Sequence, residues 1–268
     1  NVNGVYYSYD YGSVHFTVLN SNDMYPMTEA QRNWVYNDIT KSNAKWKVLL
    51  LHRAAYSAGK NINKPDTLIM RKTIIEIVDD TGVDLVLSGH DHMYFRTLPV
   101  ANDKVCKDTL YVTEKYNGKD TTFAVNPEGA VYALPSTAGT KRYGVNNDTL
   151  KAVMDAADKC FTTRSEKNSK GEELNPKAGG CFAQIDVDND RLIYKAYVVN
   201  DDTKKVTLVD QFGIKKNVAD KDVADTNLPT DILGSLDGSV ANFLTEFVGV
   251  IVTYIAKLLP QFVVGLFK

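Results

Sequence analysis

The four histidines of this 268-residue chain are unevenly placed, because three of them follow two apolar runs. His52 comes directly after the run 46–51, and His90 and His92 lie just past the run 83–88. Only one residue separates His90 from His92, so an extended backbone would point both rings to the same side. A single histidine is more often structural, but neutral imidazole also ligates zinc, iron and similar ions. Three histidines at two strand ends therefore predict a metal site.

The two apolar runs are typical of strands covered on both faces, and a helix is expected between them. Asp66 is expected to cap that helix, apolar residues from Met70 to Val78 recur at helical spacing, and Gly82 is expected to end it. A strand, a helix and a second strand in sequence predict parallel neighbouring strands joined by a right-handed crossover. Ligands of such sheets bind at the carboxyl ends of the strands, where all three histidines are expected.

Further elements are expected on both sides of this unit. Upstream, residues 5–9 and 14–19 predict a β-hairpin, and Thr28 with Gln31 three residues later predicts the start of a helix through a capping box. Downstream, 146–159 predicts a polar-faced helix and 164–180 a solvated loop. Short strands of an antiparallel or mixed sheet are expected at 110–112, 131–134, 182–187, 192–199 and 206–209.

Two other patterns could indicate sites, and both are weak. Residues 186–190 resemble a calcium-binding loop, but the glycine and the glutamate that such a loop needs are missing, so a hairpin turn is predicted. The three cysteines, Cys106, Cys160 and Cys181, form no C-x-x-C pair of a zinc site. A bridge between Cys160 and Cys181 in an exported protein and three reduced thiols both remain open.

The composition is that of an ordinary globular protein. Hydrophobic residues make up 44% of the chain and charged residues 24%, which excludes the disordered and fibrous classes. The length suits one large domain, or one domain with an appendage. The 31 basic and 33 acidic side chains give a net charge of -2. A dedicated nucleic-acid-binding protein usually carries a basic excess, so no nucleic-acid partner is expected.

The two ends of the chain differ from its middle. No initiator Met or signal-peptide pattern precedes the expected first strand, so we expect a fragment or a processed product. Residues 217–238 are expected to be a linker, and 239–268 predict an amphipathic, largely hydrophobic C-terminal helix. Glu246 and Lys257 interrupt its apolar run, which disfavours a membrane span of about 20 apolar residues. The helix is expected to lie on a membrane surface, or to pack against the domain or against a second copy.

Several motifs together resemble those of the calcineurin-like metallophosphoesterases, and within them the purple acid phosphatase branch. The two main motifs are the strand ending in His52 with Tyr56-Ser57 just after it, and Gly89-His90-Asp91-His92-Met93-Tyr94-Phe95-Arg96. Lesser ones are Gln31-x-x-Trp34, Val131-Tyr132 with Ala138-Gly139, and Val209-Asp210-x-Phe212. The resemblance extends over residues 5–216, so 1–216 is expected to be the C-terminal part of a catalytic domain.

The resemblance implies both a fold and a metal centre. The fold would be α/β (α+β), a sandwich of mixed β-sheets flanked by helices. Two metal ions would lie at the strand ends, with His52 and His90 as ligands of one and His92 as a ligand of the other; iron, zinc and manganese are the candidates. Two such ions clamp phosphate oxygens and activate a bridging hydroxide for in-line attack on phosphorus. The chain would then need no nucleophilic side chain of its own.

The sequence also departs from this family in two places. The upstream aspartate and asparagine motifs, including the bridging aspartate, do not occur in this chain. Three neutral ligands without an anionic bridge would hold one metal at best, so the missing N-terminal segment is expected on a separate cleaved chain or in a further segment of the protein. The loop after His52 lacks the additional histidines of plant relatives. Arg53 and Lys60 could supply a cation and Tyr56 a hydroxyl to the phosphate, or these residues could serve packing and solvation.

These implications predict a metal-dependent hydrolase acting on small phosphomonoesters. A phosphodiesterase or nucleotidase on the same scaffold is the alternative within enzymes, because loops set the specificity. A non-catalytic binding module that keeps the fold is the alternative outside them. By analogy with the branch, the protein is expected to be secreted or attached to the cell surface.

Overall fold

Two mixed β-sheets form the body of the part of the chain that the computed structural model describes, which is residues 5–22, 26–188 and 190–216. The strands of the larger sheet lie in the order β1 (Tyr7–Tyr11), β2 (Val14–Val18), β3 (Trp46–Arg53), β4 (Leu85–Gly89), β10 (Val131–Pro135), β5 (Tyr94–Thr97) and β11 (Ala157–Phe161). Strands β2, β3, β4 and β10 run parallel to one another, and β1, β5 and β11 pair antiparallel.

The second sheet has five strands, in the order β12 (Gly180–Asp188), β13 (Arg191–Val199), β14 (Val206–Lys215), β9 (Lys119–Val125) and β8 (Leu110–Tyr116). All its pairs are antiparallel except β14 with β9. A separate pair joins β6 (Val100–Ala101) to β7 (Lys104–Val105). Strands β12 and β13 pair along their whole length, which confirms a hairpin rather than a calcium loop at 186–190.

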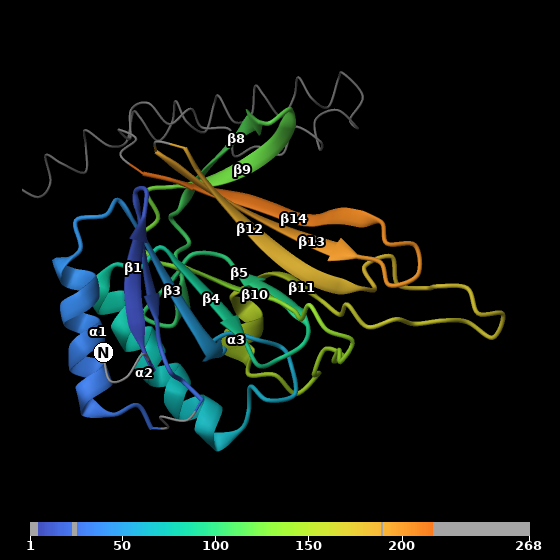
Figure 1. Ribbon diagram of the computed structural model, residues 1–268, viewed down its shortest axis with the longest axis horizontal. Helices are drawn as coiled ribbons and strands as arrows, with labels where there is room; N and C mark the ends of the chain where they lie inside the picture. Colours follow the sequence, from blue (N-terminus) through green and yellow to red (C-terminus); the bar gives the residue numbers. More distant parts are fainter. Residues whose placement is uncertain (1–4, 23–25, 189, 217–268) are drawn as a thin grey trace, which may run out of the picture. The chain divides into compact units, whose positions relative to one another are not determined.

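Helices α1 (Glu29–Lys41) and α2 (Pro65–Thr81) lie on one side of the larger sheet (Figure 1). Thr28 caps α1 as predicted, because its hydroxyl accepts from the Gln31 backbone N–H at 3.3 Å. The amide of Gln31 does not return to Thr28. It bonds the backbone of Asn20 instead, with its oxygen accepting from the N–H and its nitrogen donating to the carbonyl.

The predicted strand–helix–strand unit is present as β3, α2 and β4, with the two strands parallel. Gly82 ends α2 in the left-handed conformation, as expected. The prediction that Asp66 is the N-cap is wrong. Pro65 occupies the first turn, where its missing N–H costs nothing, and the cap position falls to Lys64.

The core forms two layers, one on each face of the larger sheet. Leu49 and Leu51 of β3 pack toward the helices, whereas Trp46 and Val48 pack toward the five-stranded sheet. This alternation follows from the period of two along a strand, and it explains why apolar residues occur on both faces of β3. The predicted fold class, a sandwich of mixed sheets flanked by helices, is confirmed.

The structure corrects one predicted element and adds several. The helix expected at 146–159 is limited to α3 (Lys151–Asp155), and the following residues form β11 at the edge of the larger sheet. Residues 157–161 contain two charged side chains, so their sequence does not reveal a strand; pairing with β5 makes them one. Strand β9 was also not expected. The loop at 164–180 is present up to the start of β12.

The three cysteines are free thiols. Cys160 packs against the core layer on the helix side and Cys181 belongs to the layer between the sheets, so the two do not meet. Among the described residues, no helix has the length and apolarity that a membrane crossing requires. The linker expected at 217–238 and the C-terminal helix expected at 239–268 lie outside the described residues.

Candidate metal centre

His52 and His90 come into contact at the carboxyl ends of β3 and β4. The Nε2 atom of His52 lies 3.1 Å from the Nδ1 atom of His90, and the two rings meet edge to face with centroids 5.0 Å apart. His52 is exposed and His90 is half-buried. Because β3 and β4 are parallel neighbours, the two side chains reach the same edge of the sheet, as the sequence predicted.

Ser21 fixes the backbone at the end of β3. Its buried hydroxyl accepts hydrogen bonds from the N–H groups of His52 and Arg53, at 3.0 and 2.9 Å. The pairing of β3 with β4 shifts register just before Arg53. The serine therefore satisfies backbone donors that the ladder leaves free, and it orients His52.

The chain turns sharply at His90, whose φ is +73°. A non-glycine residue in this left-handed region costs about 1–3 kcal/mol and is often found at functional sites. The expectation that an extended backbone points His90 and His92 to the same side is wrong for this reason. His90 turns toward His52, while His92 contacts a different segment.

His92 is held by residues 141–143. Its Nδ1 donates to the carbonyl oxygen of Lys141 at 2.5 Å, and its own carbonyl accepts from the Tyr143 N–H at 2.9 Å. Its ring stacks on the Tyr143 ring with centroids 4.6 Å apart and planes 4° from parallel. With the proton on Nδ1, the lone pair of His92 is on Nε2, the form in which a histidine ligates metal.

Asp91 joins the histidine segment to the loop after β3. Its buried carboxylate accepts from the Ser57 hydroxyl at 2.8 Å and from both the backbone N–H and the side-chain amide of Asn61, at 3.1 and 2.8 Å. Gly59 packs so closely that a Cβ there would lie 2.2 Å from the Asp91 side chain. The position of the two flanking histidines thus depends on a glycine and on three donors of the loop.

Partial desolvation and neighbouring charge favour the neutral form of the His52 and His90 rings. Desolvation lowers the pKa of His52, and the cation of Arg53 and the charge of His92 lower it further. Desolvation also lowers the pKa of His90, with His52 adding to the effect. Neutral imidazole is the form that ligates metal, so both rings are ready for a cation at neutral pH.

The donors present suit a metal ion, but they do not surround one. Two nitrogen ligands on one tetrahedral zinc ion lie about 3.3 Å apart, given zinc–nitrogen bonds of about 2.0–2.1 Å, and the separation of His52 Nε2 and His90 Nδ1 is 3.1 Å. The His90 Nε2 atom is buried without a hydrogen bond, so the Nδ1 side makes its polar contact. Within the described ranges, no three His, Cys, Asp or Glu side chains form a group that could hold a metal. The histidines therefore provide part of a coordination sphere.

The three side chains predicted to contact the phosphate are placed differently. Arg53 pairs with Asp66 at the start of α2, at 2.5 Å. Tyr56 is in the core, where its hydroxyl donates to Asp103 at 2.6 Å, so its environment is that of a packing residue. Lys60 is exposed, and its Nζ lies 4.4 Å from the centroid of Tyr143, the ring that stacks on His92. Of the three, Lys60 has the direct link to the histidines.

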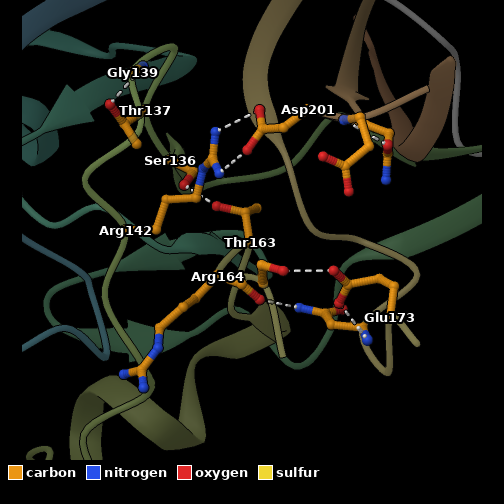
Figure 2. Close-up of polar contacts among 12 residues, drawn as sticks. Ser136, Thr137, Gly139, Arg142, Thr163, Arg164, Glu173 and Asp201 are labelled. Atoms are coloured by element: carbon orange, nitrogen blue, oxygen red, sulfur yellow. Dashed lines mark hydrogen bonds and ion pairs between the residues drawn. The ribbon is translucent and has the colours of Figure 1, made fainter. Parts of the chain in front are cut away.

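The segment 136–144 is anchored to the turn between β13 and β14 of the second sheet. Figure 2 shows the Arg142 guanidinium facing the Asp201 carboxylate in a two-point ion pair, at 2.5 and 3.1 Å. Arg142 is nearly buried, with 6% of its side chain exposed, and its hydrogen bonds lower the pKa of Asp201. Nearby, the hydroxyls of Ser136 and Thr163 bond at 2.7 Å. These contacts hold the segment that contains the Lys141 carbonyl and Tyr143.

Sequence reasoning did not identify Ser21, Lys141, Tyr143 or Asp201 as residues near the site. Each comes from a loop remote in sequence from the histidines, and their types are common on surfaces. A role for Asp91 near the site could have been predicted, because it lies between two of the candidate metal-binding histidines in the sequence. For the others, the sequence contains no signal.

The fourth histidine has a different environment. His15 is buried in β2, with Nδ1 2.7 Å from an Asp10 oxygen and Nε2 3.0 Å from an Asp38 oxygen. Asp38 also accepts from the hydroxyls of Ser8 and Thr17, at 2.5 and 2.9 Å. Since both ring nitrogens already have partners, His15 links the first hairpin to α1 and is not available as a ligand.

Sequence comparison finds that this chain is similar to a phosphoesterase family model and to parts of several acid phosphatases. Residues 1–94 match the family model described as calcineurin-like phosphoesterase. Purple acid phosphatase 21 of Arabidopsis thaliana is 32% identical over 103 residues, which cover 37% of this chain and 23% of the relative. Acid phosphatase type 7 of Mus musculus is 24% identical over 157 residues, which cover 51% and 33%. The chain thus spans about a quarter to a third of these relatives.

Among solved structures, the purple acid phosphatase PPD1 from yellow lupin (Lupinus luteus) seeds is similar in fold. Its TM-score is 0.51 at 17% sequence identity, and the match covers 84% of this chain and 36% of that one. This similarity shows that the two chains share a fold. The residues that the family model matches include the histidines at the ends of β3 and β4, because that match extends to residue 94.

Proposed function

We propose that this chain belongs to the calcineurin-like metallophosphoesterases, and that it supplies the three-histidine half of a two-metal phosphoesterase site. The main support is the 3.1 Å approach of His52 Nε2 to His90 Nδ1 at adjacent strand ends. His92 would offer its Nε2 to the second ion, because its Nδ1 is committed to Lys141. The reaction would be hydrolysis of phosphomonoesters in the manner of an acid phosphatase.

The metals, when bound, would supply an activated water and neutralise charge on the transferring phosphoryl group. The protein's own residues orient the ligands. Ser21 holds the backbone of His52, and Asp91 fixes the turn that aims His90. The Lys141 carbonyl selects the His92 tautomer. Such outer partners affect metal affinity or activity by about 10–100-fold when they are changed.

A complete site needs acidic ligands in addition. Three neutral imidazoles do not balance the charge of two divalent or trivalent ions, and bridging carboxylates commonly do so. We propose that these ligands come from a further segment of the protein, in line with the limited share of the relatives that this chain spans. Zinc, iron and manganese are the candidate metals.

Substrate, partner and location follow as parts of the same proposal. A small phosphate ester is the expected substrate, with phosphodiesters or nucleotides as the alternative because the loops around the site set specificity. Secretion or attachment to the cell surface is expected by analogy with the purple acid phosphatases.

The deciding experiment measures intact mass, metal content and hydrolysis of p-nitrophenyl phosphate on the purified protein, including any polypeptide that copurifies with it. We expect about two metals per complex and a partner segment with aspartate and asparagine ligands. Hydrolysis should cease after chelation and return with Zn²⁺, Mn²⁺ or Fe²⁺.

A metal-free chain that recovers no metal on dialysis against these ions would overturn the proposal. In that case the fold would serve as a non-catalytic binding module. Hydrolysis of bis-p-nitrophenyl phosphate at a higher kcat/KM than the monoester would move the assignment to the phosphodiesterases.

A further inference from the structure

An open cavity of about 740 Å³ lies between α1 and the β1–β2 hairpin, away from the three histidines. His15 of β2 and Ala44, just before β3, are among the residues that line it. Strands β2 and β3 are parallel and both begin here, whereas His52 lies at the far end of β3, about 20 Å away at about 3.3 Å per residue. The cavity is therefore separate from the candidate metal centre, and its volume is typical of small-molecule sites, which span about 300–1,000 Å³.

One face of α1 forms a wall of this cavity. Trp34, Asn37 and Lys41 line it at helical spacing, and Asn43 lines it from the turn after the helix. The Trp34 ring has its centroid 4.8 Å from that of Tyr6 and stays partly exposed. Within the described residues, the side chains of Lys41 and Asn43 have no hydrogen-bond or ion-pair partner. An indole, two amides and an ammonium group therefore border the same space.

The base of the cavity is acidic, but most of its oxygens already have partners. Asp38 accepts from the hydroxyls of Ser8 and Thr17. It also lies 3.0 Å from His15 Nε2, so both of its oxygens are in use. His15 Nδ1 lies 2.7 Å from one oxygen of Asp10, and the other oxygen of that exposed side chain is left for a ligand.

These groups disfavour charged ligands. Within the described ranges, no three His, Cys, Asp or Glu side chains form a group that could hold a metal. A phosphate or another anion would lie against two carboxylates and the carbonyl end of α1, where the helix dipole is negative. An organic cation would lie beside the unpaired ammonium group of Lys41. A neutral ligand with many hydroxyls suits the mixture of donors and acceptors.

We propose that this cavity binds a neutral sugar unit of a glycan. The C–H face of a sugar ring packs against an aromatic ring, which Trp34 supplies, and its hydroxyls both donate and accept hydrogen bonds. Asp10 and the amides of Asn37 and Asn43 offer acceptors, and the amides and Lys41 offer donors. The base is fixed by its own hydrogen bonds before a ligand binds, which lowers the ordering cost of binding. This activity is additional to phosphoester hydrolysis.

The test applies the purified protein to an array of neutral, acidic and amino-bearing oligosaccharides, and then titrates the best neutral ligand by calorimetry. At least one neutral glycan should bind, and EDTA should leave its affinity unchanged because the cavity needs no metal. Tryptophan emission provides a second readout. The chain has two tryptophans, and Trp46 is fully buried, so an emission change on binding reports on Trp34.

Asn37→Ala and Asn33→Ala are a matched pair of variants. Both residues are exposed on α1, and the Asn37 amide donates to the Asn33 carbonyl at 2.8 Å, but Asn37 lines the cavity and Asn33 does not. Asn37→Ala should weaken glycan binding by about 3–10-fold, the effect of one hydrogen bond. Asn33→Ala should leave it within about 2-fold. Trp34→Phe should abolish the emission change and weaken binding, and thermal midpoints check that all three variants fold.

The inference is overturned if no neutral glycan binds, or if acidic or amino-bearing glycans bind more tightly than neutral ones. It is also overturned if the neutral ligand binds Asn37→Ala and Trp34→Phe as tightly as the wild type. Metal content and hydrolysis of p-nitrophenyl phosphate do not enter these results. The two proposals therefore fail on different measurements.

Discussion

At the residue scale, the site depends on histidines whose hydrogen bonds determine which ring nitrogen can bind a metal ion. His90 adopts a left-handed backbone and directs Nδ1 to His52, and His92 donates a hydrogen bond from Nδ1–H to the Lys141 carbonyl. His15 shows the contrary case, since carboxylates face both of its nitrogens. The same residue type thus has two roles in one chain, and the role is set by the neighbours.

Replacing a ligand should remove metal without unfolding the protein. We expect His52→Ala to weaken zinc affinity by more than about 100-fold, because losing a ligand exceeds the effect of losing one of its partners. The exposed side chain of His52 contributes little packing, so the thermal midpoint of the metal-free protein should hardly change. Competition with a chromogenic chelator measures the affinity.

His15→Ala is the control for this prediction. It should lower stability, because Asp38 would lose a buried partner, and it should leave zinc affinity within about 3-fold of the wild type. Equal zinc affinity in His52→Ala and the wild type would refute the ligand assignment.

At the element scale, the site is built by loops that strands and helices place side by side. The loop after β3 lies against the turn at His90 through Asp91, and segment 136–144 lies against His92. The loop needs a glycine at 59, because no larger side chain fits beside Asp91. A change in this loop should therefore affect both stability and metal binding.

Gly59→Ala tests this coupling. The added methyl group would overlap the buried Asp91 side chain, so the free energy of unfolding should fall by about 1–3 kcal/mol. Displacement of Asp91 should also weaken zinc affinity by about 10-fold. Gly144→Ala, where nothing lies within 4 Å of the new Cβ, should change neither quantity measurably. Urea unfolding measures the free energy of unfolding of both variants, and chelator competition measures their zinc affinity.

The Arg142–Asp201 pair predicts an acid dependence of stability. Arg142 lowers the pKa of Asp201 below its ordinary value of 3.8, so the unfolded state binds more protons in that range. This contribution is fully present above pH 3.8 and is lost as the pH falls through the lowered pKa. Because Asp201 is half-exposed, it should amount to at most about 1 kcal/mol.

Arg142→Met should therefore be less stable than the wild type at neutral pH, and the difference should shrink as the pH falls below about 3.8. Thermal midpoints across that range measure it. A difference that stays constant down to the lowest pH would mean that the pair contributes through packing alone.

At the scale of the whole described body, a buried ionic cluster joins the two sheets. Arg96 of β5 donates to Asp210 of β14 at 2.6 and 3.1 Å, and the Tyr94 hydroxyl donates to the same carboxylate at 2.6 Å. Both Arg96 and Asp210 are buried. The histidine edge belongs to the first sheet, and Asp201 lies in the turn between β13 and β14 of the second, so the two sheets must keep their relative position for the site to form.

Asp210→Ala should destabilise the fold by about 3–5 kcal/mol, because it leaves the Arg96 charge buried with one partner fewer. Asp155→Ala, which removes an exposed i,i+4 pair, should cost about 0.5 kcal/mol or less. Denaturant unfolding of the two variants provides the comparison. Similar losses in both would show that the cluster between the sheets contributes no more than a surface pair.

The sequence alone determined the local elements and the residue types of the site. The apolar runs of β3 and β4, the cap at Thr28 and the end at Gly82 are set by periodicity and backbone preference, which act over a few residues. The contact between His52 and His90 could also be predicted, because the carboxyl ends of parallel neighbouring strands lie at the same edge of a sheet. The limits of α3 and the strand character of 157–161 could not, because pairing with β5 overrides local propensity.

Tertiary structure alone decided what surrounds the histidines. The turn at His90, the tyrosine stacked on His92, the pairing of Arg53 with Asp66 and the burial of Tyr56 all depend on segments that are distant in sequence. Their side-chain types are common, so no pattern along the chain distinguishes them. Contacts between loops are set by how the two sheets pack, and that packing depends on the whole core rather than on any one stretch of residues.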